Sequence, residues 1–488
     1  MSEELEILDR YTLTVNSIEV EVTILTDRDR ATPKYKINIR EITENTKLLL
    51  KRIREEFVNT LDLAELNNER LENDGDIRQK FKENVTGLID DYFPDSDKQT
   101  KKTLINYLLQ ENLGLGRIEI LLQDKQIEEL VVNSHKEPIM LYHKKYGWVE
   151  TNVTVQSESQ IRHYSTMIGR QVGKEITTLK PLLDARLQSG DRVNATLEPI
   201  SSDGNTITIR KFAEDPWTIT KFLKLGTISI AGAAFIWMAI ENEVSILVAG
   251  GTGSGKTSML NVISNFLPPN QRIISIEDTR ELQLPNDLHW VPMETRQANP
   301  EGKGGVSMQD LVVNSLRMRP DGIVVGEIRR KREAEVLVEA MLTGHSCYAT
   351  VHANNASETI TRLTNPPIDL PNHMVSAIGL VLVQNRNRRS GERHTLQIAE
   401  ITKQGKSNVI LQFDPNKDNL EQIGEFERTL STLSLYTGLS EQEIQDDLYE
   451  KETILRWLVD NDVDDIHDVG QVMKRYYTDN VTVKPLEE

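Results

Sequence analysis

The most chemically informative stretch of the sequence is residues 250–257, which read Gly-Gly-Thr-Gly-Ser-Gly-Lys-Thr. The glycines let successive backbone N–H groups curl around an anion, and a helix that starts after the loop adds positive potential. In this interpretation Lys256 reaches the β- and γ-phosphates of a nucleotide, and the Thr257 hydroxyl ligates Mg²⁺. The alternative, a glycine-rich turn without a ligand, is disfavoured because an apolar strand precedes the loop and a helical run follows it. The predicted nucleotide-binding residues are Gly250, Gly251, Thr252, Gly253, Ser254, Gly255, Lys256, Thr257 and Ser258.

Two acidic groups that follow short apolar runs are candidates for the chemistry of hydrolysis. Glu277 and Asp278 end one run, and Glu327 ends another. In an open α/β sheet ligands bind outside the carboxyl ends of the strands, so these acids are expected at the same edge as the phosphate loop. One acid would act near Mg²⁺ and the other would orient water. The alternative is that a strand-end acid caps a following helix, and this alternative is strongest for Asp278.

Two histidines flank a further apolar run, with His345 before it and His352 after it. A zinc site is disfavoured because the pair lacks the i,i+4 spacing that puts two ligands on one helical face. Two histidines around one strand favour γ-phosphate sensing or a subunit contact for at least one of them. His352 is the better placed, since it lies at the carboxyl end. The alternative for each is a polar cap at a strand end.

Alternating strand and helix patterns must position these groups. From about residue 219 to 403, apolar runs mostly separated by helical patterns predict buried strands at residues 245–249, 272–276, 322–325 and 346–350. This alternation predicts a parallel sheet covered by helices on both faces. The preceding part mixes both patterns and includes a strand expected at residues 118–120.

The length of 488 residues suits two to four domains, and the patterns suggest four parts. The second is a smaller α+β domain, the third is the α/β domain with the phosphate loop, and residues 213–216 read as the linker between them. The fourth is an acidic helical C-terminal extension, with helix expected from about residue 412 onward. The first part is a region of strands followed by helices. In chain order the four parts are residues 1–112, 113–215, 216–412 and 413–488.

The charge and hydropathy of the chain limit its partners. A formal net charge of -18 argues against broad binding of nucleic acid, which needs Lys and Arg to neutralise phosphates, although a local basic patch is compatible with it. No apolar stretch reaches the ~20 residues that span a bilayer. Residues 228–240 come nearest and read as a buried helix. A role at a membrane would therefore need other proteins to hold the chain there.

The order of these motifs resembles the ATPases of the type II/type IV secretion superfamily. Its further motifs in this sequence are an Asp box at residues 276–285, a Walker B motif at 321–327 and a His box at 343–354. Residues 316–321, 181–187 and 190–196 are similar to the tight-adherence and conjugation branch. The N-terminal region and the C-terminal segment at 433–477 resemble those of archaeal type IV pilus and archaellum ATPases.

The resemblance implies a homo-hexamer whose subunits each have an N-terminal domain hinged to a RecA-like domain, with ATP held between the two. By motif position, Glu277 would be the general base that orients water, and Glu327 would hold Mg²⁺ through water. Candidates for charge-stabilising arginines are Arg192, Arg210 and Arg329, with a surface or structural ion pair as the alternative for each. The family usually has Gly-Glu-Val-Arg-Gly where this chain has Gly-Glu-Ile-Arg-Arg. This difference leaves open which of these arginines has the charge-stabilising role of the family.

The leading hypothesis is a cytoplasmic ATP-hydrolysing motor at the inner face of the cytoplasmic membrane. It would turn against a polytopic membrane platform protein to assemble or retract a type IV pilus-like filament, and would act on pilin-like subunits only indirectly. The second hypothesis is an ATPase of conjugation-type DNA transfer, again without direct contact with nucleic acid. The third is a nucleotide-gated scaffold with little hydrolysis, which the two glutamates disfavour.

Overall fold

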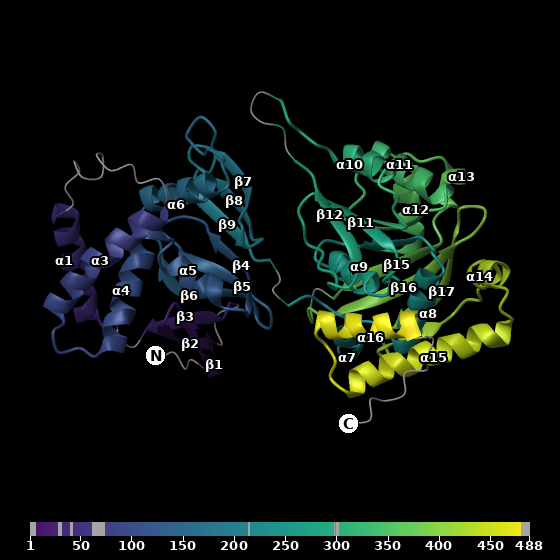
Figure 1. Cartoon of the computed structure of the whole chain (residues 1–488), viewed down its shortest axis with the longest axis horizontal. Helices are drawn as coiled ribbons and strands as arrows, with labels where there is room; N and C mark the ends of the chain where they lie inside the picture. The colour runs from purple at the N-terminus through teal and green to yellow at the C-terminus, as the bar shows by residue number, and fades with distance from the viewer. Residues whose placement is uncertain are drawn as a thin grey trace. The chain divides into compact units, whose positions relative to one another are not determined.

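A computed structural model shows two compact units, Met1–Glu214 and Asp215–Glu488 (Figure 1). The structure describes residues 6–27, 32–39, 42–60, 74–212, 215–296, 298, 302–387 and 389–479. Ala213 and Glu214, the first half of the expected linker, lie outside the described residues. The finer division of the chain into four parts stays a prediction.

The first unit is built on a nine-stranded sheet with the order β1-β2-β3-β6-β5-β4-β9-β8-β7. Its strands are β1 (Glu6–Val15), β2 (Ile18–Thr26), β3 (Lys34–Ile39), β4 (Ile127–Val132), β5 (Pro138–His143), β6 (Gly147–Thr154), β7 (Leu182–Arg186), β8 (Arg192–Thr196) and β9 (Thr206–Arg210). Its helices are α1 (Glu44–Thr60), α3 (Asp74–Tyr92), α4 (Lys98–Leu113), α5 (Arg117–Gln123) and α6 (Glu158–Gln171). The pair β3 and β6 is parallel and the other neighbours are antiparallel.

The strand expected at residues 118–120 is wrong, because these residues belong to helix α5. Ile118, Ile120 and Leu121 are all buried, a pattern in which the first and last lie three residues apart on one side of a helix. The alternation Ile-Glu-Ile covers only three residues, which is too short to separate a period of two from a helical period.

The second unit contains a nine-stranded sheet with the order β12-β11-β13-β14-β10-β15-β16-β17-β18. Its strands are β10 (Ile246–Gly250), β11 (Arg272–Glu277), β12 (His289–Glu294), β13 (Gly322–Val325), β14 (Ser346–Val351), β15 (Leu380–Arg386), β16 (Arg393–Ile401), β17 (Ser407–Asp414) and β18 (Asn419–Gln422). The strands from β12 to β15 are parallel, and β16, β17 and β18 extend the sheet in antiparallel fashion. The predicted α/β class with a parallel sheet is therefore confirmed.

Helices cover both faces of this sheet, as predicted. They are α7 (Ile219–Lys224), α8 (Ile230–Glu241), α9 (Lys256–Ser264), α10 (Met308–Ser315), α11 (Lys331–Leu342), α12 (Ala356–Thr364), α13 (Asn372–Val375), α14 (Thr429–Thr437), α15 (Glu441–Asp460) and α16 (Ile466–Asp479). Along β10, Ile246 and Val248 pack into one core, while Leu247 and Ala249 pack into the core on the opposite face. A strand buried on both faces reads as a continuous apolar run, which is why this strand could be predicted.

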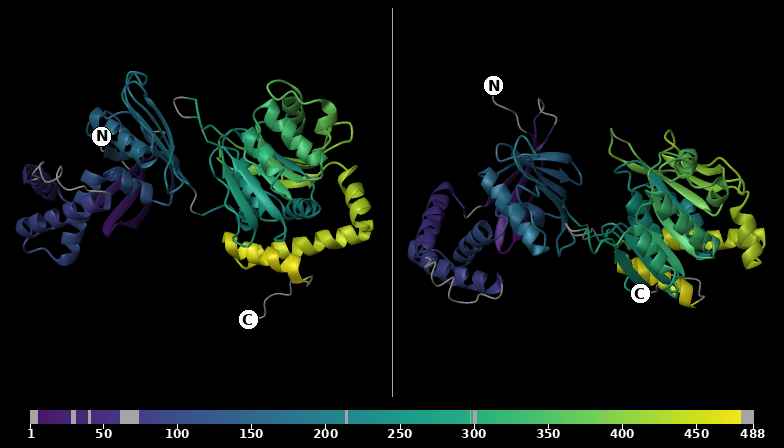
Figure 2. Two further views of the ribbon diagram at one scale, coloured as in Figure 1. Left: turned by 45° about the horizontal axis from the view of Figure 1, so that its top comes forward. Right: turned by 90° about the horizontal axis from the view of Figure 1, so that it is seen from above.

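The helical extension begins later than expected. Residues 419–422 form strand β18, which pairs with β17, and the first helix of the extension starts at Thr429. The short strand is hard to read from sequence because only Leu420 among its residues is buried. In Figures 1 and 2, α15 and α16 lie along one side of the second unit, where α15 packs against α7 and α8.

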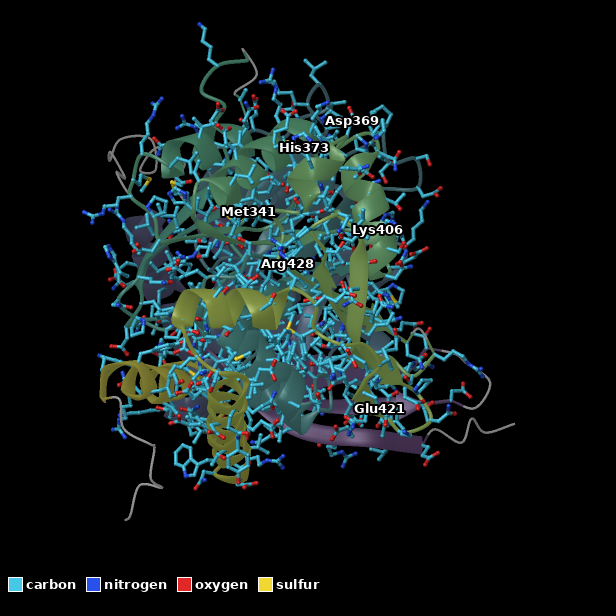
Figure 3. The ribbon with its side chains drawn as sticks, turned by 90° about the vertical axis from the view of Figure 1, so that its right-hand side faces the viewer. Met341, Asp369, His373, Lys406, Glu421 and Arg428 are labelled. Atoms are coloured by element: carbon cyan, nitrogen blue, oxygen red, sulfur yellow. The ribbon has the colours of Figure 1, made fainter. Side chains whose placement is uncertain are left out.

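The start of α14 is fixed to the sheet by Glu400 of β16, whose side chain is fully buried. Its carboxylate accepts hydrogen bonds from the backbone N–H groups of Glu427, Arg428 and Thr429. The guanidinium of Arg428, which is labelled in Figure 3, donates hydrogen bonds to the carbonyls of Ser376, Ile378 and Ile401. A carboxylate at a helix N-terminus complements the unpaired N–H groups there, so this extension begins at a defined point.

A fully buried lysine, Lys451 of α15, joins the extension to the core. Its Nζ lies 2.7 Å from a carboxylate oxygen of Glu241, at the end of α8, and contacts Asp447. It also donates to the Tyr476 hydroxyl at 2.7 Å. Burial raises the pKa of the Glu241 carboxyl, and the charge and hydrogen bond of Lys451 oppose that rise.

We expect Lys451→Met to lower the free energy of unfolding by roughly 3 kcal/mol, because removing one partner leaves buried charge uncompensated. This value is at the low end of the range that is usual for breaking a buried ion pair, because Glu241 and Asp447 keep 29% and 24% of their side chains exposed. The matched control is Lys417→Met in the exposed pair with Glu421. Urea unfolding checks the prediction, which fails if the two variants unfold at the same midpoint.

None of the helices in the described ranges is both long enough and apolar enough to cross a membrane.

Candidate active site

The phosphate loop connects β10 to α9 at the centre of the second sheet. β10 lies between β14 and β15, and α9 begins at Lys256, directly after the loop. Gly253 and Gly255 have φ angles of +72° and +92°, which a side chain would strain. A Cβ on Gly250 would lie 2.3 Å from Ser254 Oγ and 2.6 Å from the Gln384 carbonyl oxygen, so only glycine fits there. The backbone is thus shaped as an anion-binding turn at a helix N-terminus.

Lys256 is buried in this loop, with 9% of its surface exposed. Its Nζ donates to the Gly251 carbonyl at 2.8 Å and lies 3.4 Å from His352 Nδ1. Burial lowers the pKa of this lysine. In the described part of the chain, Lys256 forms no ion pair with a carboxylate. A buried cation without an anionic partner fits the phosphates of a nucleotide, while Thr257 and Ser258 follow it in the first turn of α9.

Glu277 is the last residue of β11, and only 2% of it is exposed. One carboxylate oxygen accepts hydrogen bonds from the backbone N–H groups of Glu281 and Leu282, at 2.9 and 3.1 Å. The other oxygen, Oε2, is buried and has no hydrogen-bond partner among the described residues. Burial raises the pKa of this carboxyl to about 7, although the two N–H groups oppose the rise. Such a group can take up a proton near neutral pH, as a general base must.

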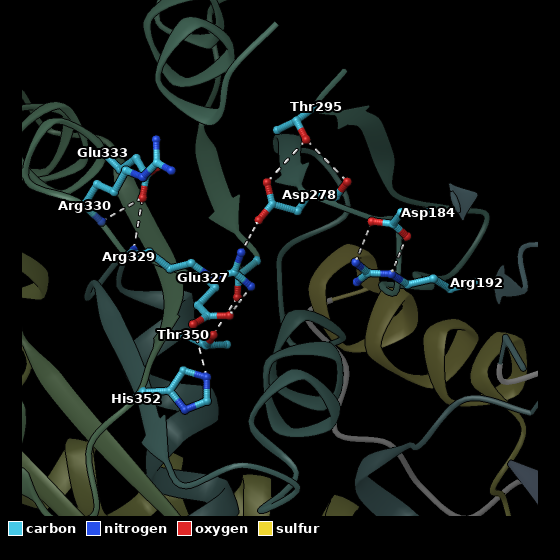
Figure 4. A network of polar contacts seen from close by, with 11 residues as sticks. Asp184, Arg192, Asp278, Thr295, Glu327, Arg329, Arg330, Glu333, Thr350 and His352 are labelled. Atoms are coloured by element: carbon cyan, nitrogen blue, oxygen red, sulfur yellow. Dashed lines mark hydrogen bonds and ion pairs between the residues drawn. The ribbon is translucent and has the colours of Figure 1, made fainter. Parts of the chain in front are cut away.

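Arg329 connects two of the predicted acids. Its guanidinium donates to Glu327 Oε2 at 2.8 Å and to Asp278 Oδ2 at 2.7 Å (Figure 4). His352 Nε2 lies 3.1 Å from the second oxygen of Glu327. Both oxygens of Glu327 are therefore held by neighbours, and His352 links this carboxylate to Lys256. Burial lowers the pKa of His352, and the nearby lysine acts in the same direction.

The turn after β13 places Glu327 within this network. The Thr350 hydroxyl of β14 donates to the Gly326 carbonyl at 2.6 Å, and the Gly326 N–H donates to the Ile276 carbonyl of β11. The Asp278 carboxylate also accepts from the Thr295 hydroxyl at 3.3 Å. The element that follows β11 is strand β12, so the helix cap considered for Asp278 does not form.

His345 lies at the opposite end of β14 from His352, before the strand begins. Its ring nitrogen Nδ1 is 3.3 Å from both the Ala340 carbonyl and the Thr343 hydroxyl, at the end of α11. The structure thus brings only His352 to the phosphate loop, and the contacts of His345 match the polar cap that was its alternative.

The remaining predicted arginines belong to the first unit. Arg192 begins β8 and forms a two-point ion pair with Asp184 of β7, with distances of 3.3 and 3.1 Å (Figure 4). Arg210 ends β9 and is the cross-strand partner of Arg192. Both are exposed. A role for them toward the phosphate loop stays a prediction.

Two arginines outside the sequence motifs also lie at the loop. Arg393 of β16 donates from Nε to the Gly253 carbonyl at 3.1 Å. Arg386 of β15 reaches within 3.6 Å of the position where a Cβ on Gly253 would stand. The signal in the sequence is a run of four arginines at positions 386, 388, 389 and 393 in an otherwise acidic chain.

Comparison with known proteins places this site in a family. A family model described as type II/IV secretion system protein matches residues 116–410. MJ0900 of Methanocaldococcus jannaschii is 32% identical over 386 residues, which span 76% of this chain and 69% of MJ0900. MJ0781 of the same organism is 39% identical over 351 residues, which span 70% of this chain but only 46% of MJ0781.

Among solved structures, the Legionella pneumophila ATPase DotB is 20% identical, with a TM-score of 0.43 and coverage of 70% of this chain and 86% of DotB. This is a distant likeness, whereas the family model matches more than half of the sequence. The chain therefore belongs to the type II/IV secretion system protein family.

Proposed function

We propose that this chain hydrolyses ATP at the carboxyl edge of the second sheet and serves as the motor of a secretion or type IV pilus-like machine. The observation that carries the proposal is that one sheet presents both Lys256, a buried cation without a carboxylate partner in the described residues, and the buried, unpartnered Oε2 of Glu277. Strand β10, which leads into the phosphate loop, and strand β11, which ends at Glu277, are parallel members of one sheet, so their carboxyl ends lie at one edge. The family match supports the same activity.

In the proposed reaction, the phosphate loop and Lys256 hold the phosphates of ATP, and water attacks the γ-phosphorus. A bond forms between the water oxygen and phosphorus, while the bond to the oxygen that bridges the β- and γ-phosphates breaks and ADP leaves with that electron pair. Glu277 Oε2 accepts the proton that the water loses. The N–H groups of Glu281 and Leu282 hold the other carboxylate oxygen, so the accepting oxygen has a fixed position.

Oxygen ligands suitable for Mg²⁺ are present at the same edge. The Thr257 hydroxyl would bind the ion directly and Glu327 would hold it through water, while the ion neutralises charge on the phosphates when bound. Because Arg329 and His352 already engage both oxygens of Glu327, a contact through water fits this carboxylate better than a direct bond. Arg329 then positions Glu327 and Asp278 of its own chain. These contacts favour a positioning role over that of an arginine that enters the site of a neighbouring subunit.

We further propose that the motor works as a homo-hexamer on the inner face of the cytoplasmic membrane, against a polytopic platform protein that handles pilin-like subunits. The description of the matching family as a secretion system protein supports this setting. We propose that Arg192 and Arg210 of the first unit act on the nucleotide. The support is that they place two positive charges side by side on neighbouring strands.

A membrane partner is expected to stimulate ATP turnover several-fold. Purified chain would be mixed with Mg²⁺, ATP and native membrane vesicles, crosslinked, and its partners identified by mass spectrometry, with liposomes of the same lipids as the control. Recovery of a polytopic membrane protein together with stimulation supports the motor. Recovery of a DNA-processing enzyme would favour conjugation-type transfer. Slow turnover that neither preparation changes would favour the nucleotide-gated scaffold.

A further inference from the structure

The hairpin formed by β15 and β16 ends beside the phosphate loop of the same chain. β15 pairs with β10 in parallel, and the register places Gln384 opposite Gly250. The absence of a side chain on Gly250 allows this close approach, because a Cβ there would meet the Gln384 carbonyl at 2.6 Å. Gln384 is itself buried and donates to the Thr395 hydroxyl of β16 at 2.9 Å. The end of the hairpin is therefore held in a fixed position relative to the loop.

Two guanidinium groups from this hairpin lie over the glycines of the loop. Arg393 donates from Nε to the Gly253 carbonyl, and its Cδ lies 3.5 Å from where a Cβ on Gly255 would stand. Arg386 is the cross-strand partner of Arg393, and its Nη1 lies 3.6 Å from where a Cβ on Gly253 would stand. Gly253 and Gly255 are the two residues whose left-handed φ angles give the loop its shape.

The charge of this arrangement indicates an anionic ligand. Arg386 and Arg393 stand directly opposite each other on neighbouring strands, so the hairpin brings two guanidinium groups to one place beside the loop. Arg393 is half-buried and forms no ion pair in the part of the chain that the structure describes. Its contact with Gly253 uses one of the five N–H donors of a guanidinium, which leaves the two Nη groups for a ligand.

We propose that Arg393, with Arg386 beside it, is a phosphate-binding residue that the same chain supplies to the nucleotide site. The ligand class is a nucleoside di- or triphosphate, and the inference rests on the proposed function because it takes the phosphate loop as the nucleotide site. Arg393 acts in two ways at once: its Nε fixes the Gly253 carbonyl, and its remaining donors add positive charge on the outer side of the loop. Lys256 supplies charge from the buried side.

The test compares ADP with adenosine, each displacing a fluorescent ADP analogue from the full-length chain. We expect Arg393→Gln to weaken ADP binding on the order of tenfold, as for the loss of one charge-assisted hydrogen bond, and to leave adenosine binding unchanged. Arg393→Gln should also flatten the decrease of ADP affinity with rising salt, because a charge that contacts phosphate has been removed. Arg393→Lys should retain the salt dependence. The matched control is Arg389→Gln, an exposed arginine of the same hairpin, which should change neither quantity.

The outcomes separate this inference from the proposed function. If the unaltered chain binds ADP and Lys256→Ala removes binding, while Arg393→Gln binds ADP with the original affinity and salt dependence, the inference alone is overturned. A loss of ADP affinity without a change in salt dependence would show that Arg393 only shapes the loop, and would overturn its role as a phosphate ligand. If the unaltered chain binds no ADP, the proposed function and the inference both fail. Thermal unfolding of each variant shows whether it is folded.

Discussion

Replacing Glu277 with glutamine is expected to slow ATP turnover by roughly 10²- to 10⁴-fold, because the variant lacks the group that accepts a proton from water. Glutamine keeps the size of the side chain, and its carbonyl oxygen can still accept the N–H groups of Glu281 and Leu282. Nucleotide binding should therefore remain close to that of the unaltered chain. Phosphate release measured at saturating ATP checks the prediction, and Glu339→Gln, an exposed carboxylate on α11, is the matched control.

The pH dependence of turnover gives an independent test of the same residue. Burial raises the pKa of Glu277 to about 7, so its carboxylate form, the base, is present above that pH and is lost below it. Turnover by the unaltered chain should therefore increase as the pH rises from 6 to 8, through the pKa of about 7. A rate that stays constant across this range, or a Glu277→Gln variant with the original rate, would show that another group activates water.

The phosphate loop and the two glutamates could be placed from sequence because each depends on local rules. Gly253 and Gly255 need backbone conformations that glycine adopts readily, and the buried strand before them reads as an apolar run. Glu277 and Glu327 lie at the carboxyl ends of two strands of one parallel sheet, so strand direction alone places them at the same edge. These features need no knowledge of the strand order.

The contacts that the sequence did not reveal depend on the strand order and on partners far along the chain. Arg393 lies 140 residues from Gly253 and reaches it only because β15 is the neighbour of β10. The bridge from Arg329 to Asp278 likewise needs β11 and β13 to be adjacent. The sequence does not distinguish strand β18 from helix, because its single buried residue gives no period from which to choose.

The arrangement around Glu327 connects the two sides of the site. Lys256 lies near His352, His352 contacts Glu327, and Arg329 connects Glu327 to Asp278. A change in charge at the phosphate loop, such as the arrival of phosphates beside Lys256, would act on His352 first. Because the Arg329 side chain is 58% exposed, water screens its ion pairs, and they can rearrange at small cost. The network is thus suited to respond to the nucleotide rather than to stabilise the fold.

Lys256→Ala is expected to reduce ATP turnover by roughly 10²- to 10³-fold, as for the loss of one donor to developing negative charge. It should also weaken the binding of ATP and ADP, because it removes the buried cation of the loop. The fold should not lose stability, since burial lowers the pKa of Lys256 and so disfavours its charged form in the folded chain. Phosphate release, nucleotide binding and thermal unfolding check the three parts.

Two further variants show whether charge alone is needed at this position. Lys256→Arg keeps the positive charge but has a larger, planar head group, and with 9% of Lys256 exposed the site has little room for it. We expect its turnover to be close to that of Lys256→Ala. Lys331→Ala, an exposed lysine paired with Asp369 on the same unit, should turn over ATP at the original rate. If Lys256→Ala hydrolyses ATP as fast as Lys331→Ala, the loop does not carry the reaction.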